Sequence, residues 1–217
     1  MNELVFLEPN RLGAIPFTTS DVIADFTGNS YRSIQRTIVR HVSRLETFGR
    51  VRFQITPFET NGGVQEKKIY KLNEPQATLL ITFLKNTDVV ADFKTELVRQ
   101  FYAMRAELMK RQVYREQLKP IRRELTDVVQ ENPDKGEWSY KIYTDLAYKS
   151  AIGKTAAQLR RERNAPQKAK AIDYMTAEEI SEVAKAQNRI SVLHEMGMGY
   201  EQIKALMTQK LMVGKLA

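Results

Sequence analysis

The chain has 217 residues and no cysteine, which excludes disulfide bonds and thiolate metal sites. Its 34 lysine and arginine residues outnumber 26 aspartate and glutamate residues, and the net charge of +8 favours a polyanionic partner. Most of this excess falls within residues 109–171, whereas residues 1–108 are nearly balanced. No apolar run approaches the roughly 18 residues that a membrane-spanning helix needs, so we expect no membrane partner.

Residues 17–42 predict two short helices joined by a tight turn. The first helix begins after Thr18 or Thr19, which are both good N-cap residues, and Gly28 suits the left-handed conformation that ends a helix. The second helix has apolar residues at helical spacing, which predicts one buried face. These apolar residues are Ile34, Ile38 (or Val39) and Val42.

The second helix carries a basic ridge on a different face. Its arginines recur every four residues, and arginine can bond guanine in the DNA major groove while glutamine can bond adenine. The alternative is that these arginines, with Arg44, form an ordinary solvated helix face. The residues expected to contact DNA here are Asn29, Ser30, Tyr31, Arg32, Ser33, Gln35, Arg36 and Arg40.

A β-hairpin is predicted next, as a wing beside the second helix. Apolar and polar residues alternate along its first strand, so one face is expected to be buried. The apolar positions are Val51, Phe53 and Ile55. Asn61-Gly62-Gly63 suits the turn, and the return strand covers residues 65–72. Arg52, Lys67 and Lys68 are expected to contact phosphate, although both lysines also suit an edge strand that resists aggregation.

Several separated phrases in this half of the chain resemble the Rha family of phage regulatory proteins. In chain order they are PFTTSDVIA, FGRVRFQITPFETNGGVQEKKIYKLNEPQATLLITFLKNT and DFKTELVRQFYAMR. The resemblance covers about residues 16–108, and residues 120–207 resemble the C-terminal extension of some members. It implies a phage-encoded regulator with a DNA-binding domain related to those of phage antirepressors, acting in the host cytoplasm.

Beyond the hairpin the sequence predicts helices. Asn73-Glu74-Pro75 begins one, and a long helix runs from about Val89 to Lys119, where Pro120 ends it. Its first half has an apolar seam that we expect to pack on the winged domain, and its basic second half is a connecting arm or a self-association helix. The seam residues are Phe93, Leu97, Phe101, Met104 and Leu108.

Residues 120–170 predict two further helices around a turn at Gly153, the second of them capped by Thr155. Their basic residues are a second, weaker candidate for DNA contact, and the alternative is a basic helical module with its arginines in water. The residues of this second patch are Lys154, Arg160, Arg161 and Arg163. A capping box at Thr176 then begins a final helical hairpin.

These patterns predict a mainly α chain of the α+β class with a small β-hairpin. We expect a winged helix-turn-helix domain over residues 1–108, a basic helical linker and second helical module over residues 109–170, and an all-α hairpin over residues 171–217 for oligomerisation or partner binding. The long helix connects the first two of these regions. The predicted function is DNA-binding control of phage gene expression. The alternative is an antirepressor that inactivates a phage repressor by protein contact.

The expected partners are double-stranded DNA, a phage repressor under the alternative, and further copies of the chain. We expect no enzyme, cofactor or metal site. The sequence has no Walker loop, GxGxxG or HExxH motif, and its two histidines, His41 and His194, are far apart.

Overall fold

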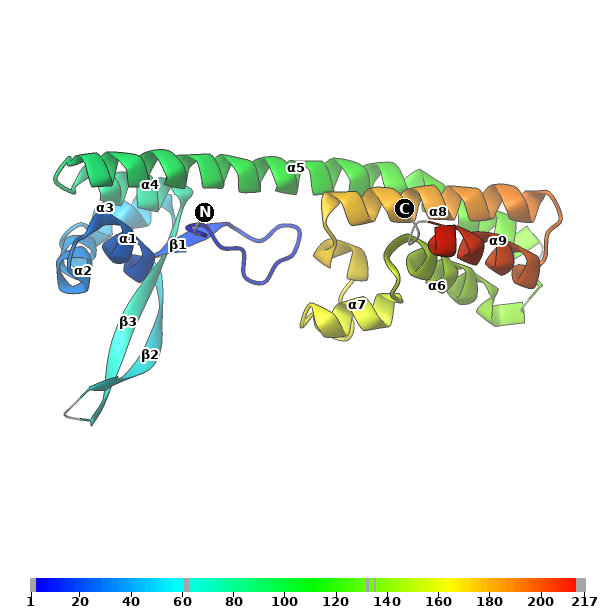
Figure 1. Cartoon of the computed structure of the whole chain (residues 1–217), viewed down its shortest axis with the longest axis horizontal. Coiled ribbons are helices and arrows are strands. Elements are labelled where there is room, and N and C mark those ends of the chain that lie inside the picture. The colour runs from blue at the N-terminus through cyan, green and yellow to red at the C-terminus, as the bar shows by residue number, and fades with distance from the viewer. Residues whose placement is uncertain (1–2, 61–62, 132, 135, 214–217) are drawn as a thin grey trace. The chain divides into compact units, whose positions relative to one another are not determined.

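The structure is a computed structural model of the chain (Figure 1). The residues it describes are 3–60, 63–131, 133–134 and 136–213. They are mainly helical with one three-stranded antiparallel sheet, which confirms the expected fold class. The chain divides into two compact units. The first comprises Met1–Glu8 and Gly13–Ala106, and the second comprises Pro9–Leu12 and Glu107–Ala217.

The first unit contains the predicted helix-turn-helix and hairpin. Its elements are β1 (Phe17–Thr19), α1 (Ser20–Thr27), α2 (Tyr31–Arg40), α3 (Val42–Leu45), the 3-10 helix η1 (Glu46–Phe48), β2 (Arg52–Thr60), β3 (Gly63–Asn73), α4 (Glu74–Thr82) and the first part of α5 (Asp88–Glu131). The sheet has the order β1-β3-β2. The sequence patterns do not predict β1, in which Thr18 pairs with Leu72. Thr19 takes the N-cap position of α1 without a side-chain hydrogen bond.

The turn between α1 and α2 forms as its residues predict. Gly28 has the left-handed φ of 66° that a residue with a side chain rarely adopts, and it ends α1. Ser30 then caps α2, because its side chain accepts a hydrogen bond from the backbone N–H of Ser33. Asn73 caps α4 in the same way, within a capping box that includes Gln76.

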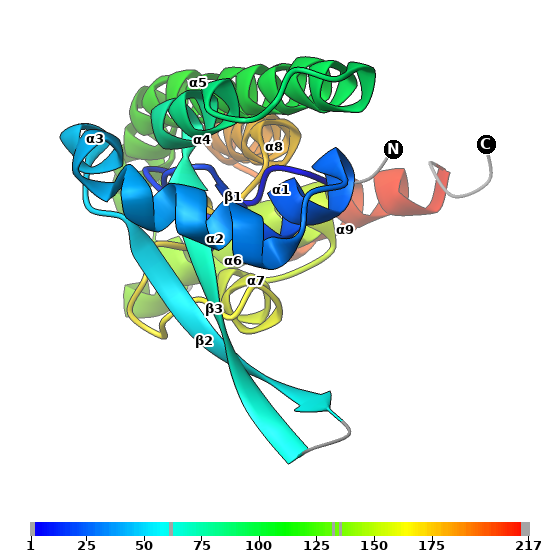
Figure 2. The ribbon, with the colours of Figure 1, turned by 90° about the vertical axis from the view of Figure 1, so that its left-hand side faces the viewer.

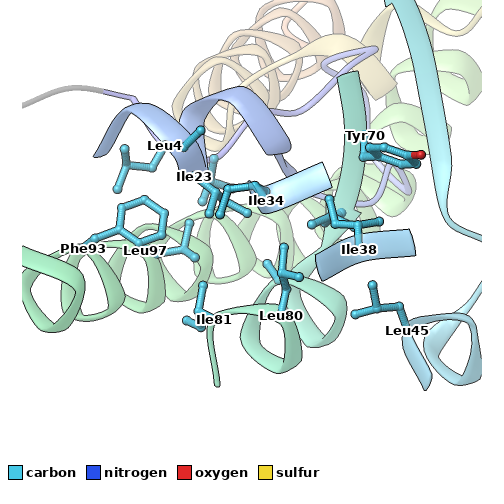
Figure 3. Packing of buried hydrophobic residues seen from close by; sticks show 14 of the residues in the cluster. Leu4, Ile23, Ile34, Ile38, Leu45, Tyr70, Leu80, Ile81, Phe93 and Leu97 are labelled. Atoms are coloured by element: carbon cyan, nitrogen blue, oxygen red, sulfur yellow. The ribbon is translucent and has the colours of Figure 1, made fainter. Parts of the chain in front are cut away.

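Helices α1, α2, α4 and α5 share one apolar core with β3 (Figure 3). The labelled residues of this core are Leu4, Ile23, Ile34, Ile38, Leu45, Tyr70, Leu80, Ile81, Phe93 and Leu97. Burying an aliphatic side chain of this size contributes about 1.5–3 kcal/mol. Ile38 is fully buried whereas Val39 is 58% exposed, so Ile38 is the residue that continues the seam of α2.

The hairpin β2–β3 projects beyond α1, α2 and α3 of its own unit (Figure 2). Phe53 and Ile55 are therefore 49% and 55% exposed, although Val51 at the base is buried. The prediction of a buried face beyond Val51 is wrong, because alternation marks one face of a strand but not how far the core extends beneath it. Gly63 has a φ of 109°, and Asn61 and Gly62 lie outside the described residues.

The prediction that α5 ends at Pro120 is wrong, because the helix continues to Glu131. A proline inside a helix removes one backbone hydrogen bond and costs about 3 kcal/mol. Burial of apolar side chains on both sides of the proline offsets that cost within the second unit. These side chains are Leu118, Leu125, Val128 and Val129.

The regular elements of the second unit are all helices among its described residues. Its elements after α5 are the 3-10 helix η2 (Gly136–Trp138), α6 (Ser139–Ile152), α7 (Ala156–Glu162), the 3-10 helix η3 (Ala171–Tyr174), α8 (Ala177–Glu195) and α9 (Tyr200–Val213). Gly153 ends α6 with a φ of 72°. Thr155 caps α7 and Thr176 forms a capping box at α8, as predicted, and the cap at Thr155 is also a capping box. No helix of the described chain is long and apolar enough to cross a membrane.

A short N-terminal loop belongs to the second unit through polar contacts. The Oδ1 atom of Asn10 accepts a hydrogen bond from Nη1 of Arg111 at 2.8 Å, and the N–H of Leu12 donates to the carbonyl of Asp173 at 2.6 Å. Arg115 forms an ion pair with Asp173 at 2.8 Å. These contacts join the loop to α5 and η3.

Candidate nucleic-acid interface

Helix α2 presents a ridge of three exposed arginines, Arg32, Arg36 and Arg40, here called the arginine ridge. Fully buried Ile34 and Ile38 on the opposite side fix the orientation of the helix. No arginine of the ridge forms an ion pair with any residue that the structure describes. The ridge is therefore available to an external anion.

Two residues of the predicted contact set act within the turn itself. Nδ2 of Asn29 donates a hydrogen bond to Oγ1 of Thr27 at 2.9 Å, and Oγ of Ser30 caps α2. Ser33 is exposed and Gln35 is half-buried beside the arginine ridge. Ser33 and Gln35 are therefore better placed for an external contact than Asn29 and Ser30, whose side chains bond within the turn.

Tyr31 joins α2 to the hairpin. Its hydroxyl donates a hydrogen bond to the main-chain carbonyl of Lys68, and the ammonium of Lys67 lies 4.3 Å from the centre of its ring. Burial raises the pKa of the Tyr31 hydroxyl, which therefore stays a neutral donor. This geometry makes Tyr31 a brace between α2 and β3.

The hairpin β2–β3, here called the wing, carries its own cations. Nζ of Lys68 lies 3.7 Å from the ring centre of Phe53 and 5.4 Å from that of Tyr70. Arg52 is exposed at the start of β2. Cation–π contacts at exposed sites contribute only about 0.5–1 kcal/mol, so the lysines can leave these rings for a phosphate at small cost.

Sequence reasoning missed the roles of two residues of this site, one buried beneath it and one exposed. Ser20 is fully buried, and its Oγ accepts the backbone N–H of Tyr70 at 3.0 Å, which ties α1 to β3. Val39 is exposed on the same side of α2 as Arg32 and Arg36. Val39 lies seven residues after Arg32 and three after Arg36, and this spacing could have predicted that it shares their side of the helix. Nothing local in the sequence predicts the contact of Ser20.

The comparison with known families bears on this surface. Residues 18–106 match the family model of phage regulatory protein Rha. The matched stretch is here called the Rha region. The Rha region contains α1, α2, the wing and the first part of α5, and the match supports a phage regulatory role. No curated protein matches the chain.

The second basic patch lies outside the Rha region, and two of its four residues are paired within the chain. Nζ of Lys154 lies 2.5 Å from Oε2 of Glu162, and the hydrogen bond from Lys154 lowers the pKa of that carboxyl. Arg163 lies 2.8 Å from Glu179. Arg161 is exposed and Arg160 is half-buried. This patch has fewer available charges than the arginine ridge and wing together.

Both histidines pack against aromatic rings. The ring of His41 stacks on Phe83 with centroids 4.0 Å apart, and buried His194 meets Tyr143 edge-on at 5.1 Å. Among the described residues, no group of three or more histidine, aspartate or glutamate side chains comes together as a metal site would require.

Proposed function

We propose that the Rha region is a sequence-specific DNA-binding domain through which the chain controls phage transcription. The observation that carries this proposal is the exposed arginine ridge, which forms no ion pair within the described residues, directly follows the tight turn, and lies on the helix that Tyr31 joins to the wing. Helix-turn-helix domains place such a helix in the major groove.

The residue types suit some side chains to DNA bases and others to the DNA backbone. Arg32, Arg36 and Gln35 can bond base edges, because guanine and adenine offer paired groups that arginine and glutamine match. Arg40 and the wing lysines are suited to phosphates, which position a protein without reading the sequence. Such contacts release counterions and make binding salt-dependent.

A second candidate function is inactivation of a phage repressor by direct protein contact. The wing supports it, because three of its large apolar side chains are exposed, whereas charged and polar residues normally cover a projecting hairpin. These side chains are Phe53, Ile55 and Val64. The near balance of charge in residues 1–108 also suits a protein partner.

We also propose that the chain self-associates through its second unit. Helices α6, α8 and α9 border a groove of about 720 Å³, and the exposed apolar side chains of Val192 and Leu206 line it. A helix-turn-helix dimer matches the two-fold symmetry of a palindromic DNA site, so a second copy is the partner that fits the proposed function.

A paired substitution separates the two candidate functions. Arg36→Ala with Arg40→Ala is expected to weaken DNA binding and to lower the salt slope by about one for each lost phosphate contact. Lys85→Ala with Arg99→Ala removes the same charge from exposed positions of the same unit outside α2, and is the control. If the first pair changes neither DNA binding nor regulation while removal of residues 172–217 abolishes regulation, the DNA-binding proposal is wrong.

A further inference from the structure

Val39 is an apolar residue among the polar and charged residues that α2 exposes. It lies seven residues after Arg32 and three after Arg36, so all three point from the same side of α2. Ile34 and Ile38 already fill the core beneath the helix, and 58% of Val39 remains exposed. Val39 therefore contributes little to the core and is available to a ligand of α2.

A small apolar notch extends from Val39 toward the wing. It has a volume of about 290 Å³ and is bordered by α2, α3, η1 and the wing, with Phe53 and Tyr70 on the wing side. Two cations, Arg50 and Lys68, also border it. Its one carboxylate, Glu46, is engaged by the backbone N–H of Val51 at 3.3 Å.

This combination suits a small apolar group carried by a polyanion. In the major groove of DNA that group is the 5-methyl of thymine, which is the apolar feature that distinguishes base edges there. We infer that Val39 and the notch beside it bind the 5-methyl group of a thymine in the recognised DNA site. This inference rests on the proposed DNA-binding function. The arginine ridge beside Val39 would hold the same strand or its complement.

The size of the effect follows from the size of the group. Burying one methyl-sized group changes an equilibrium constant by about fourfold. Val39→Ala should leave the fold intact, because Val39 is largely exposed and alanine favours a helix more than valine does.

The test uses the full-length chain and a duplex that it selects from a random-sequence library. Each thymine of that duplex is replaced in turn by deoxyuridine, which removes only the methyl group, and affinity is measured by fluorescence anisotropy. The proteins compared are the unchanged chain, Val39→Ala, and Val98→Ala as a control at another exposed valine of the same unit.

The inference predicts that at least one deoxyuridine weakens binding of the unchanged chain and of Val98→Ala by about fourfold, and does not weaken binding of Val39→Ala. Two outcomes would overturn it while leaving DNA recognition standing: no sensitive thymine, or equal sensitivity in Val39→Ala. If the chain selects no sequence at all, the proposed function fails as well. A loss of repressor binding on Val39→Ala, with no change in DNA affinity, would assign the notch to a protein partner instead.

Discussion

The hydroxyl of Tyr31 at the start of α2 donates a hydrogen bond to the main-chain carbonyl of Lys68 in β3. This contact joins two segments 37 residues apart in the chain. Ser20 adds a second tie, because its Oγ accepts the N–H of Tyr70. The direction of the wing relative to α2 is therefore fixed by the helices as well as by the sheet.

Tyr31→Phe should loosen the wing while keeping the aromatic ring. We expect a loss of about 0.5–1.5 kcal/mol in the free energy of unfolding, the typical contribution of one hydrogen bond. Amide hydrogen exchange should also become faster in β3 near Lys68. Urea denaturation and hydrogen exchange measure the two effects. Tyr102→Phe, at an exposed tyrosine of α5, is the control, and equal effects of the two substitutions would contradict the bracing role.

Pro120→Ala should stabilise the second unit. Alanine restores a backbone donor and removes the clash of the proline ring inside α5, so we expect a gain of about 1–3 kcal/mol in the free energy of unfolding. Gln117→Ala, at another exposed position of α5, controls for helix propensity. A loss of stability on Pro120→Ala would show that the packing of this unit requires the proline.

Glu107 anchors the start of α8 and should make the second unit sensitive to acid. Its Oε1 accepts hydrogen bonds from the N–H of Ala177 at 3.0 Å and from Nε of Arg111 at 2.9 Å. Burial opposes ionisation, but these two bonds outweigh it and lower the pKa of the carboxyl. Glu107→Gln should cost about 1.5–3 kcal/mol at neutral pH, because the buried guanidinium of Arg111 loses its charged partner.

The lowered pKa of Glu107 sets the direction of the pH dependence. Its contribution is present above the ordinary glutamate pKa of about 4.3 and is lost as pH falls through the lower pKa of the folded state. Glu107→Gln should therefore cost much less at acid pH than at neutral pH. Urea denaturation over this range tests it, with exposed Glu124→Gln as the control. A cost independent of pH would refute the assignment.

Tyr143 should make the second unit sensitive to alkali. Burial, together with the hydrogen bond to Oδ2 of Asp134 at 3.0 Å, raises the pKa of its hydroxyl strongly. Below about pH 10 the hydroxyl is neutral in both states, and above it the unfolded chain ionises first, so stability falls as pH rises. Tyr143→Phe should flatten this alkaline slope in urea denaturation followed by circular dichroism. An unchanged slope would contradict the burial argument.

Local chemistry was sufficient to predict much of the fold. The turn at Gly28 and the caps at Asn73, Thr155 and Thr176 depend on residues within a few positions of one another, and all four form. The apolar seam of α5 also forms, because helical spacing marks a buried face regardless of the partner.

The features that sequence reasoning missed depend on distant contacts. Strand β1 has three residues, and its partner Leu72 lies far along the chain, so no local pattern marks it. The continuation of α5 past Pro120 depends on tertiary burial that offsets a local penalty. The hydrogen bond from Tyr31 to Lys68 is equally long-range. The sequence therefore predicts a DNA contact for Tyr31 but not its contact with β3.

The most direct test of the central claim is the sequence specificity of DNA binding by the full-length chain. Fluorescence anisotropy would compare a duplex selected from a random library with a scrambled duplex of equal length and composition, at two salt concentrations. The proposal predicts binding to the selected duplex at least about 10³-fold tighter than to the scrambled one, with salt dependence in both. Equal affinity for the two duplexes would contradict sequence-specific recognition.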